Sequence, residues 1–249
     1  MPNSGSRSNP RRPKGAHARS VAHRVRTRVE NGGERLWSLE DFPGLSPSAV
    51  ARALSRLTEE GLLERRRKGV YYRARGTRFG LSVPTASAVA AQTLRAPVHP
   101  AGLTAANVLG FTTQNPGRLE YATSAGAPPT ALADAIVHTR RPASREGLSP
   151  EDGALLEFLR ERASTSDLSP DATVARLRKL LRDRERFARL VRAAADEPPR
   201  VRAMLGAAGE QVGADPKLLG RLRKSLNPLS RFEFGRLRSL RYAREWQAK

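Results

Sequence analysis

Arginine and serine residues gather on one side of a predicted helix that follows Ser46, and both residue types can contact nucleic acid. Apolar residues of this segment recur at three- and four-residue steps and form one stripe of Val50, Ala53, Leu54 and Leu57. At about 100° per residue, the polar side and its flank hold Ser48, Arg52, Ser55 and Arg56. Arginine donates two hydrogen bonds to guanine, and serine bonds to bases or phosphates. We expect DNA contacts from Ser46, Ser48, Arg52, Ser55 and Arg56; the alternative is a solvated helix face.

Four consecutive cations follow this helix at a predicted turn between two strands. The first strand begins at Leu62 and the second spans residues 70–73, with Arg65, Arg66, Arg67, Lys68 and Gly69 between them. Cations at a hairpin tip can hold phosphate oxygens, which positions a domain on a duplex without reading its sequence. We therefore expect phosphate contacts from Arg65, Arg66, Arg67 and Lys68, with a solvated charge run as the alternative.

Two further helices precede this segment and complete a DNA-binding arrangement. Residues 21–29 form a short amphipathic helix, and a helix of one to two turns contains Leu39 and Phe42. The third helix has Ser46 as a favourable N-cap, and Gly61 can take the left-handed conformation that ends it. Three helices followed by a hairpin is the order of a winged helix-turn-helix, whose third helix enters the major groove.

The remainder of the chain divides into a mixed segment and a helical one. Residue patterns predict helices near 84–94 and 104–109 and strands near 119–123 and 135–138. Helix-start signals at Ser149 and Ser169, each followed by proline, open a charged helical region. We expect an α+β protein with four parts: a disordered basic arm (1–19), a winged helix-turn-helix (20–76), a small mixed α/β unit (77–146) and a helical C-terminal region (147–249).

The charge of the chain favours a polyanionic partner. The 249 residues carry 45 Lys and Arg against 24 Asp and Glu, a net charge of +21. Residues 1–80 hold 18 basic and 7 acidic side chains, a net charge of +11, so the predicted binding module has half of the excess. Only six of the basic residues are lysine, and such a skew toward arginine also follows from codon bias.

Several classes of site lack a sequence signal. The chain contains no cysteine, which excludes disulfides and thiolate chemistry and favours a cytoplasmic location. No apolar run is long enough for a membrane span. Phosphate-binding loops, dinucleotide motifs, hydrolase elbows and zincin motifs are absent. The four histidines, at 17, 23, 99 and 138, have no second ligand at helical or hairpin spacing. We therefore expect no enzyme, cofactor or metal site.

Several stretches together resemble a known family. They are SAVARALSRLTEEGLL (48–63), KGVYY (68–72), GLSVPT (80–85), GLTAANVLGFTTQNP (102–116) and YAT (121–123). This pattern, spread over residues 20–145, is similar to that of the AbiEi antitoxins of type IV toxin-antitoxin systems, which are linked to abortive infection during phage attack. Phe111 and Asn115 stand where the pattern has Leu and Val.

The resemblance implies a DNA-binding protein that represses its own operon, with an operator of inverted repeats. It also implies a further domain that counteracts a nucleotidyltransferase toxin, with or without a stable complex. The alternative from another class is an RNA-binding or ribosome-associated winged-helix protein that holds structured RNA by charge and shape. Aromatic residues make up 5% of the chain, which argues against stacking platforms for single strands. A neighbouring gene for a nucleotidyltransferase would separate the two hypotheses.

Overall fold

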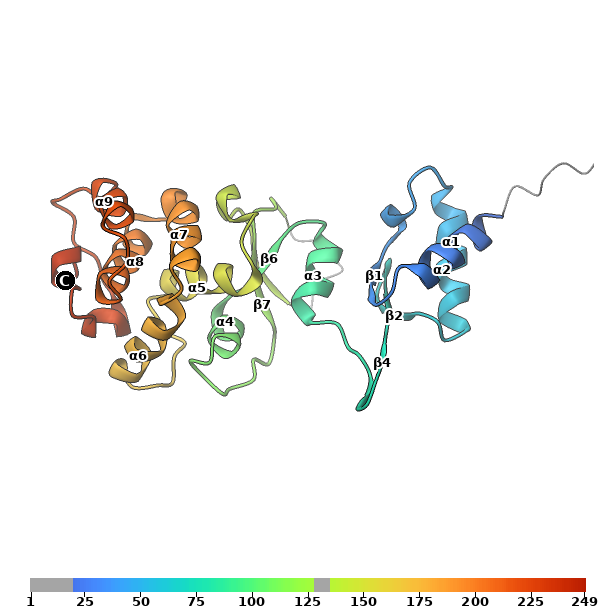
Figure 1. The fold of residues 1–249 in the computed structure, drawn as a ribbon, viewed down its shortest axis with the longest axis horizontal. Helices are drawn as coiled ribbons and strands as arrows, with labels where there is room; N and C mark the ends of the chain where they lie inside the picture. Colours follow the sequence, from blue (N-terminus) through green and yellow to red (C-terminus); the bar gives the residue numbers. More distant parts are fainter. Residues whose placement is uncertain (1–19, 128–134) are drawn as a thin grey trace, which may run out of the picture. The chain divides into compact units, whose positions relative to one another are not determined.

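A computed structural model describes residues 20–127 and 135–249 of the chain. It divides the chain into two compact units, Met1–Val83 and Pro84–Lys249 (Figure 1). The predicted arm at residues 1–19 lies outside the described residues. Each unit has a core of its own and combines helices with small sheets, so the predicted α+β class is confirmed. No helix in the described part of the chain is long and apolar enough to cross a membrane.

The first unit has the element order of a winged helix. Its elements are α1 (Val21–Asn31), β1 (Arg35–Trp37), the 3₁₀ turn η1 (Leu39–Asp41), α2 (Pro47–Glu59), β2 (Glu64–Arg67), β3 (Val70–Arg73), β4 (Gly76–Thr77) and β5 (Gly80–Leu81). Strands β1, β3 and β2 form an antiparallel sheet in that order. The second predicted helix, of one to two turns, is present as a single 3₁₀ turn that ends before Phe42, and β1 was not predicted. Three residues are too few to show a strand pattern.

The predicted apolar stripe of α2 lies in the core of the first unit. Val50 and Leu54 are fully buried against Val25 and Val29 of α1. The helix ends as predicted: Gly61 has φ +76°, and the amide of Leu62 bonds to the carbonyl of Leu57 at 2.9 Å. The position of α2 against α1 is therefore fixed by packing, which leaves its polar side free for other contacts.

Both tyrosines of the KGVYY stretch are buried, whereas alternation along a strand predicts that one of them is partly exposed. Tyr71 packs into the core below the sheet. Tyr72 points to the other face, where its hydroxyl donates to Glu34 at 2.6 Å and lies 3.0 Å from the Ser82 hydroxyl. This hydrogen bond lowers the pKa of Glu34. The segment that ends at Ser82 therefore covers the second face of β3 and belongs to the first unit.

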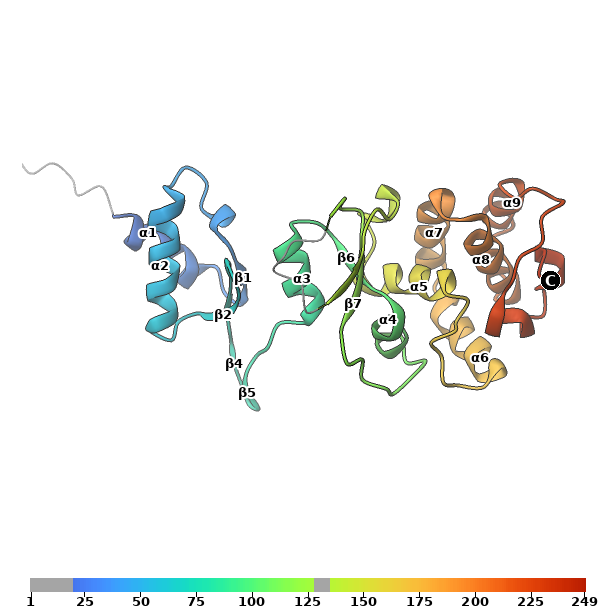
Figure 2. The same ribbon diagram turned by 180° about the vertical axis from the view of Figure 1, so that it is seen from behind.

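The second unit joins a small sheet to a helical array (Figure 2). Its elements are α3 (Ala86–Leu94), β6 (Val98–Pro100), α4 (Gly102–Val108), β7 (Glu120–Thr123), β8 (Ile136–His138), η3 (Ala143–Arg145), α5 (Pro150–Arg160), α6 (Pro170–Leu181), α7 (Arg184–Ala193), η4 (Ala194–Asp196), α8 (Pro199–Gln211), α9 (Pro216–Lys224), η5 (Gly235–Ser239) and η6 (Arg244–Trp246). Strand β7 pairs antiparallel with β6 and parallel with β8. Ser149 and Ser169 cap α5 and α6 as predicted.

The structure places the boundaries differently from the four predicted parts. Residues 77–83 belong to the first unit, and residues 84–249 form one unit without a border at residue 146. The physical reason is a continuous core: Leu109 and Phe111 pack in the same cluster as helices α5 to α8, and the Phe111 ring stacks on Phe158 at 3.9 Å. A mixed segment ending at residue 146 would expose this apolar surface to water.

A buried group of ion pairs also connects the mixed segment to the helices of the second unit. Arg145 is 1% exposed and contacts both Glu157 of α5 and Glu197 just before α8. Arg141 donates to Glu157 at 2.8 Å, and Arg160 donates to Glu197 at 2.8 Å. Burial opposes ionisation of Glu157, but its arginine partners prevail and lower its pKa. Because buried charges need such partners, these contacts fix the orientation of the elements involved.

Candidate nucleic-acid interface

The polar side of α2 is exposed along the helix. All five predicted contact residues on it are exposed: Ser46, Ser48, Arg52, Ser55 and Arg56. The guanidinium groups of Arg52 and Arg56 have no hydrogen-bond or ion-pair partner among the described residues. A free guanidinium keeps all of its donors for an external acceptor, such as a base edge or a phosphate oxygen.

Other arginines of the first unit are already used inside it. Arg26 pairs with Glu60 and Glu30, and Arg35 pairs with Asp41. The hydrogen bond that Arg26 donates to the Glu60 carboxylate raises the pKa of Arg26. Arg73 donates to the carbonyl of Val29 at 2.6 Å, at the C-terminal end of α1. These three arginines therefore stabilise the fold of the first unit, unlike Arg52 and Arg56 of α2.

The first turn of α2 is open to an anion. Ser46 occupies the N-cap position, but its hydroxyl lies 3.1 Å from that of Ser48 instead of accepting a bond from a helix amide. Unsatisfied amides and the positive end of the helix dipole favour a negative group at such a terminus. Ser46 and Ser48 can therefore present both hydroxyls and amides to a phosphate.

The predicted wing exists, but its cations do not lie in a turn as expected. Arg65, Arg66 and Arg67 belong to β2, and only Lys68 and Gly69 form the two-residue turn to β3. Gly69 has φ +75°, a conformation that this tight turn requires. Arg66 is paired with Glu64 at 3.0 Å and Arg67 is half-buried with an internal interaction. Arg65 and Lys68 are thus the exposed cations with no partner among the described residues of the wing.

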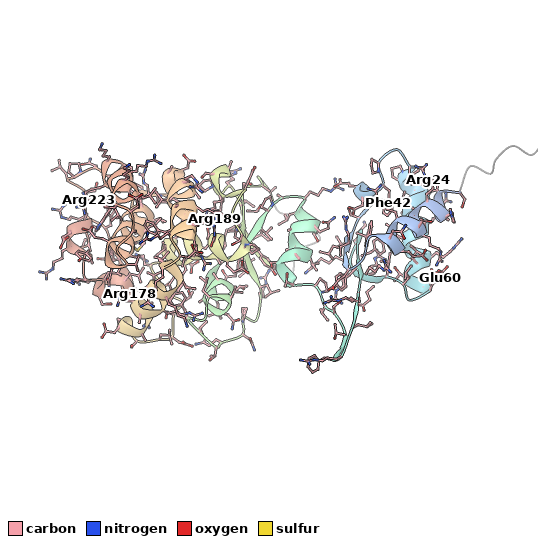
Figure 3. All side chains as sticks on the ribbon, in the orientation of Figure 1. Arg24, Phe42, Glu60, Arg178, Arg189 and Arg223 are labelled. Carbon is pink, nitrogen blue, oxygen red and sulfur yellow. The ribbon has the colours of Figure 1, made fainter. Side chains whose placement is uncertain are left out.

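A hollow of about 340 Å³ with cationic walls lies between α1 and the segment that leads to α2. Its lining includes His23, Arg24 and Arg28 of α1 and Phe42 of the connection. Figure 3 shows Arg24 and Phe42 in this part of the first unit. The Arg28 guanidinium lies over the Phe42 ring at 5.9 Å. The sequence analysis did not assign a site to these cations, because the hollow depends on the connection between α1 and α2.

A second hairpin, β4 and β5, adds an aromatic residue that the sequence analysis did not single out. Its two-residue tip is Arg78 and Phe79, with the Arg78 guanidinium 4.7 Å from the Phe79 ring centre. Phe79 is 86% exposed, and Leu81 and Val83 are exposed after it. In Figure 1 the hairpin projects from the sheet of the first unit. Alternation of apolar residues at 79, 81 and 83 was a readable signal of a strand with one apolar side.

The residues of the GLTAANVLGFTTQNP stretch have structural roles in the second unit. Thr112 donates to Asp167 at 2.7 Å, and Asn107 donates to the carbonyl of Gln114 at 3.0 Å. The Leu109 carbonyl accepts from Arg176 at 2.8 Å. These contacts hold the stretch against the helices of the second unit.

Comparisons with known proteins find a family model that is similar to less than half of the chain. Residues 22–135 match the sequence model of DUF6088, a family of unknown function. No curated protein matches the chain. Among solved structures, the crystal structure of the Rv2827c protein from Mycobacterium tuberculosis is similar at 18% identity and a TM-score of 0.47, covering 90% of this chain and 88% of that one.

Proposed function

We propose that the first unit binds double-stranded DNA, with α2 in the major groove and the β2–β3 wing on the phosphate backbone, and that the protein acts as a transcriptional repressor of its own operon. The observation that carries this proposal is the pair of free guanidinium groups, Arg52 and Arg56, on the exposed side of an otherwise packed helix. An α-helix fits the major groove, where each base pair presents a distinct pattern of donors and acceptors.

The remaining cations of the unit supply the sequence-independent part of this binding. Arg65 and Lys68 on the wing contact phosphates to one side of α2, and Arg24 and Arg28 contact them from α1. Such contacts release counterions from DNA and set the salt dependence of affinity. The open first turn of α2 adds a further phosphate position at Ser46 and Ser48.

The test is binding of full-length protein to duplex DNA from upstream of its own gene, measured by fluorescence anisotropy. Scrambled DNA of equal length and an RNA duplex of the same sequence are the competitors. We expect the upstream duplex to bind at least about 10³-fold more tightly than the scrambled one, which is the lower end of the range for specific binding. Equal affinity for the RNA duplex would instead favour the RNA-binding hypothesis, in which the protein holds structured RNA by charge and shape.

We also propose that the second unit counteracts a nucleotidyltransferase toxin. The resemblance to AbiEi antitoxins supports this second proposal, and the boundary after Val83 defines the two fragments for its test. Residues 1–83 and 84–249 each contain a complete core, so each fragment is expressed separately. Residues 84–249 should rescue growth on co-expression with a neighbouring nucleotidyltransferase, and residues 1–83 should repress a reporter. Rescue by folded residues 1–83 alone would reverse the assignment.

A further inference from the structure

Three side chains of metal-ligand type meet at the edge of the small sheet in the second unit. They are Glu120 of β7, His138 of β8 and Glu161 at the C-terminal end of α5, and their ligand atoms all lie within 4.8 Å of one another. Each of the three is partly buried. The sequence analysis found no second ligand near His138, because parallel pairing of β7 with β8 and the packing of α5 bring these residues together from distant positions.

Two of the three are already at the separation that a bound ion requires. His138 Nε2 lies 3.3 Å from Glu120 Oε2. Two ligands at Zn–N and Zn–O distances of about 2.0–2.1 Å and a tetrahedral angle lie about 3.3–3.4 Å apart. The carboxylate of Glu120 also needs Gly102 beside it, because a Cβ at that position would lie 2.3 Å from the carboxylate. The ligand atom of Glu161 lies within 4.8 Å of those of the other two residues.

The charges around this cluster are not balanced by the protein. In a chain rich in arginine, Asp152, Glu157 and Glu197 each have two arginine partners. Glu161, in contrast, has no ion-pair partner among the described residues, and Glu120 has only His138.

The position of Glu161 on its helix adds to this imbalance. The residue caps the C-terminus of α5, where the helix dipole disfavours an anion. Its carboxylate also lies within 4.8 Å of the ligand atoms of Glu120 and His138, so two carboxylates approach one another here. A cation at this position would relieve all of these costs at once, because it would neutralise the carboxylates where they face one another.

We propose that Glu120, His138 and Glu161 bind one divalent transition-metal ion, with Zn²⁺ as the best match. An imidazole ligand suits Zn²⁺, whereas Mg²⁺ and Ca²⁺ prefer all-oxygen sites. The ion joins the β7–β8 pair to the end of α5 and thereby stabilises the second unit. Three protein ligands leave the fourth position of a tetrahedral ion to water or to an incoming ligand atom.

The experiment uses full-length protein without an affinity tag and ZnCl₂ or MgCl₂ as probes. Equilibrium dialysis gives the stoichiometry, and thermal unfolding gives the shift in Tm. We expect one Zn²⁺ per chain and a Tm rise of about 5–10 °C at a hundredfold excess over Kd, with no comparable effect of MgCl₂. His138→Ala and Glu161→Gln should each abolish the shift. The control variant, with His17→Ala and His23→Ala together, should retain it.

Glu161→Gln distinguishes metal binding from a purely structural role. Because Glu161 has no ion-pair partner among the described residues, this variant should keep the Tm of the metal-free protein while losing the Zn²⁺ response. Equal Zn²⁺ stoichiometry and Tm shift in His138→Ala and the parent protein would overturn the proposal. Absence of a Zn²⁺ response in the folded parent protein would overturn it as well.

Discussion

Replacing Arg65 and Lys68 by alanine should lower the affinity for all DNA sequences and flatten its salt dependence. These are the exposed wing cations with no partner among the described residues, whereas Arg66 is paired with Glu64 and Arg67 is half-buried. Each phosphate contact contributes about 0.9 to the slope of log K against log salt concentration, so the double variant should lose about 1.8. Between about 50 and 200 mM salt, that difference makes the loss of affinity about tenfold smaller than in the parent protein.

The assay is fluorescence anisotropy with a labelled duplex at a series of KCl concentrations. The matched control removes one arginine and one lysine from the second unit, Arg221 and Lys224 on α9, which are both exposed. This control has the same net charge as the wing variant but should keep the parent slope. Arg66→Ala should change the slope by less than 0.9, about the value of one full contact, because Arg66 already has Glu64 as a partner. An unchanged slope in the wing variant, or equal flattening in the control, would refute the assignment of the wing.

Three further predictions concern recognition and stability. Arg52→Ala should weaken specific binding by about 1–3 kcal/mol and leave binding to scrambled DNA nearly unchanged, as competition assays can show; equal losses on both would make Arg52 a phosphate contact. Glu197→Ala should destabilise the second unit by about 3–5 kcal/mol in urea unfolding, because it leaves Arg145 buried with a lost partner; a change below about 1 kcal/mol would contradict this role. Burial and Arg145 lower the pKa of His99 below 6.5. As the pH falls, His99 therefore takes up a proton in the unfolded chain before it does so in the folded protein, which lowers stability, so the Tm should decrease from about pH 7 to pH 5. His99→Gln should show a smaller decrease in Tm; a decrease equal to that of the parent protein would exclude His99 as the cause.

The sequence predicted those features of the fold that are local. The stripe and the ends of α2 follow from residue spacing and from Gly61, and these were confirmed. The caps at Ser149 and Ser169 were confirmed for the same reason. Strands β1 and β6 were missed, and each has only three residues, over which a period of two is weakly expressed. Strand β8 is equally short, but it lies within the strand predicted near 135–138.

The features that the sequence did not predict depend on contacts between distant residues. Tyr72 is buried because Glu34 and Ser82 cover it, and alternation along β3 gives no sign of this cover. The pairing of Arg66 with Glu64 is an exception, because the two residues are neighbours on β2; it was missed because the sequence analysis counted the residues of the basic run only as charges. The meeting of Glu120 with His138 depends on the parallel register of two strands that 12 residues separate.

The use of arginine in this chain shows why pairing is a better guide to function than charge. Both units contain many arginines, yet Arg145 and Arg160 of the second unit are held by buried carboxylates and stabilise its interior. Removing such a partner costs several kcal/mol, so these arginines are committed to the fold. Arg52 and Arg56 have no such partner among the described residues and therefore contribute little to stability, so their replacement should affect binding far more than unfolding. Arg52→Ala could instead lower the free energy of unfolding of the first unit by as much as it weakens the free energy of DNA binding. That result would refute the distinction between structural and binding arginines at the residue on which the proposed function most depends.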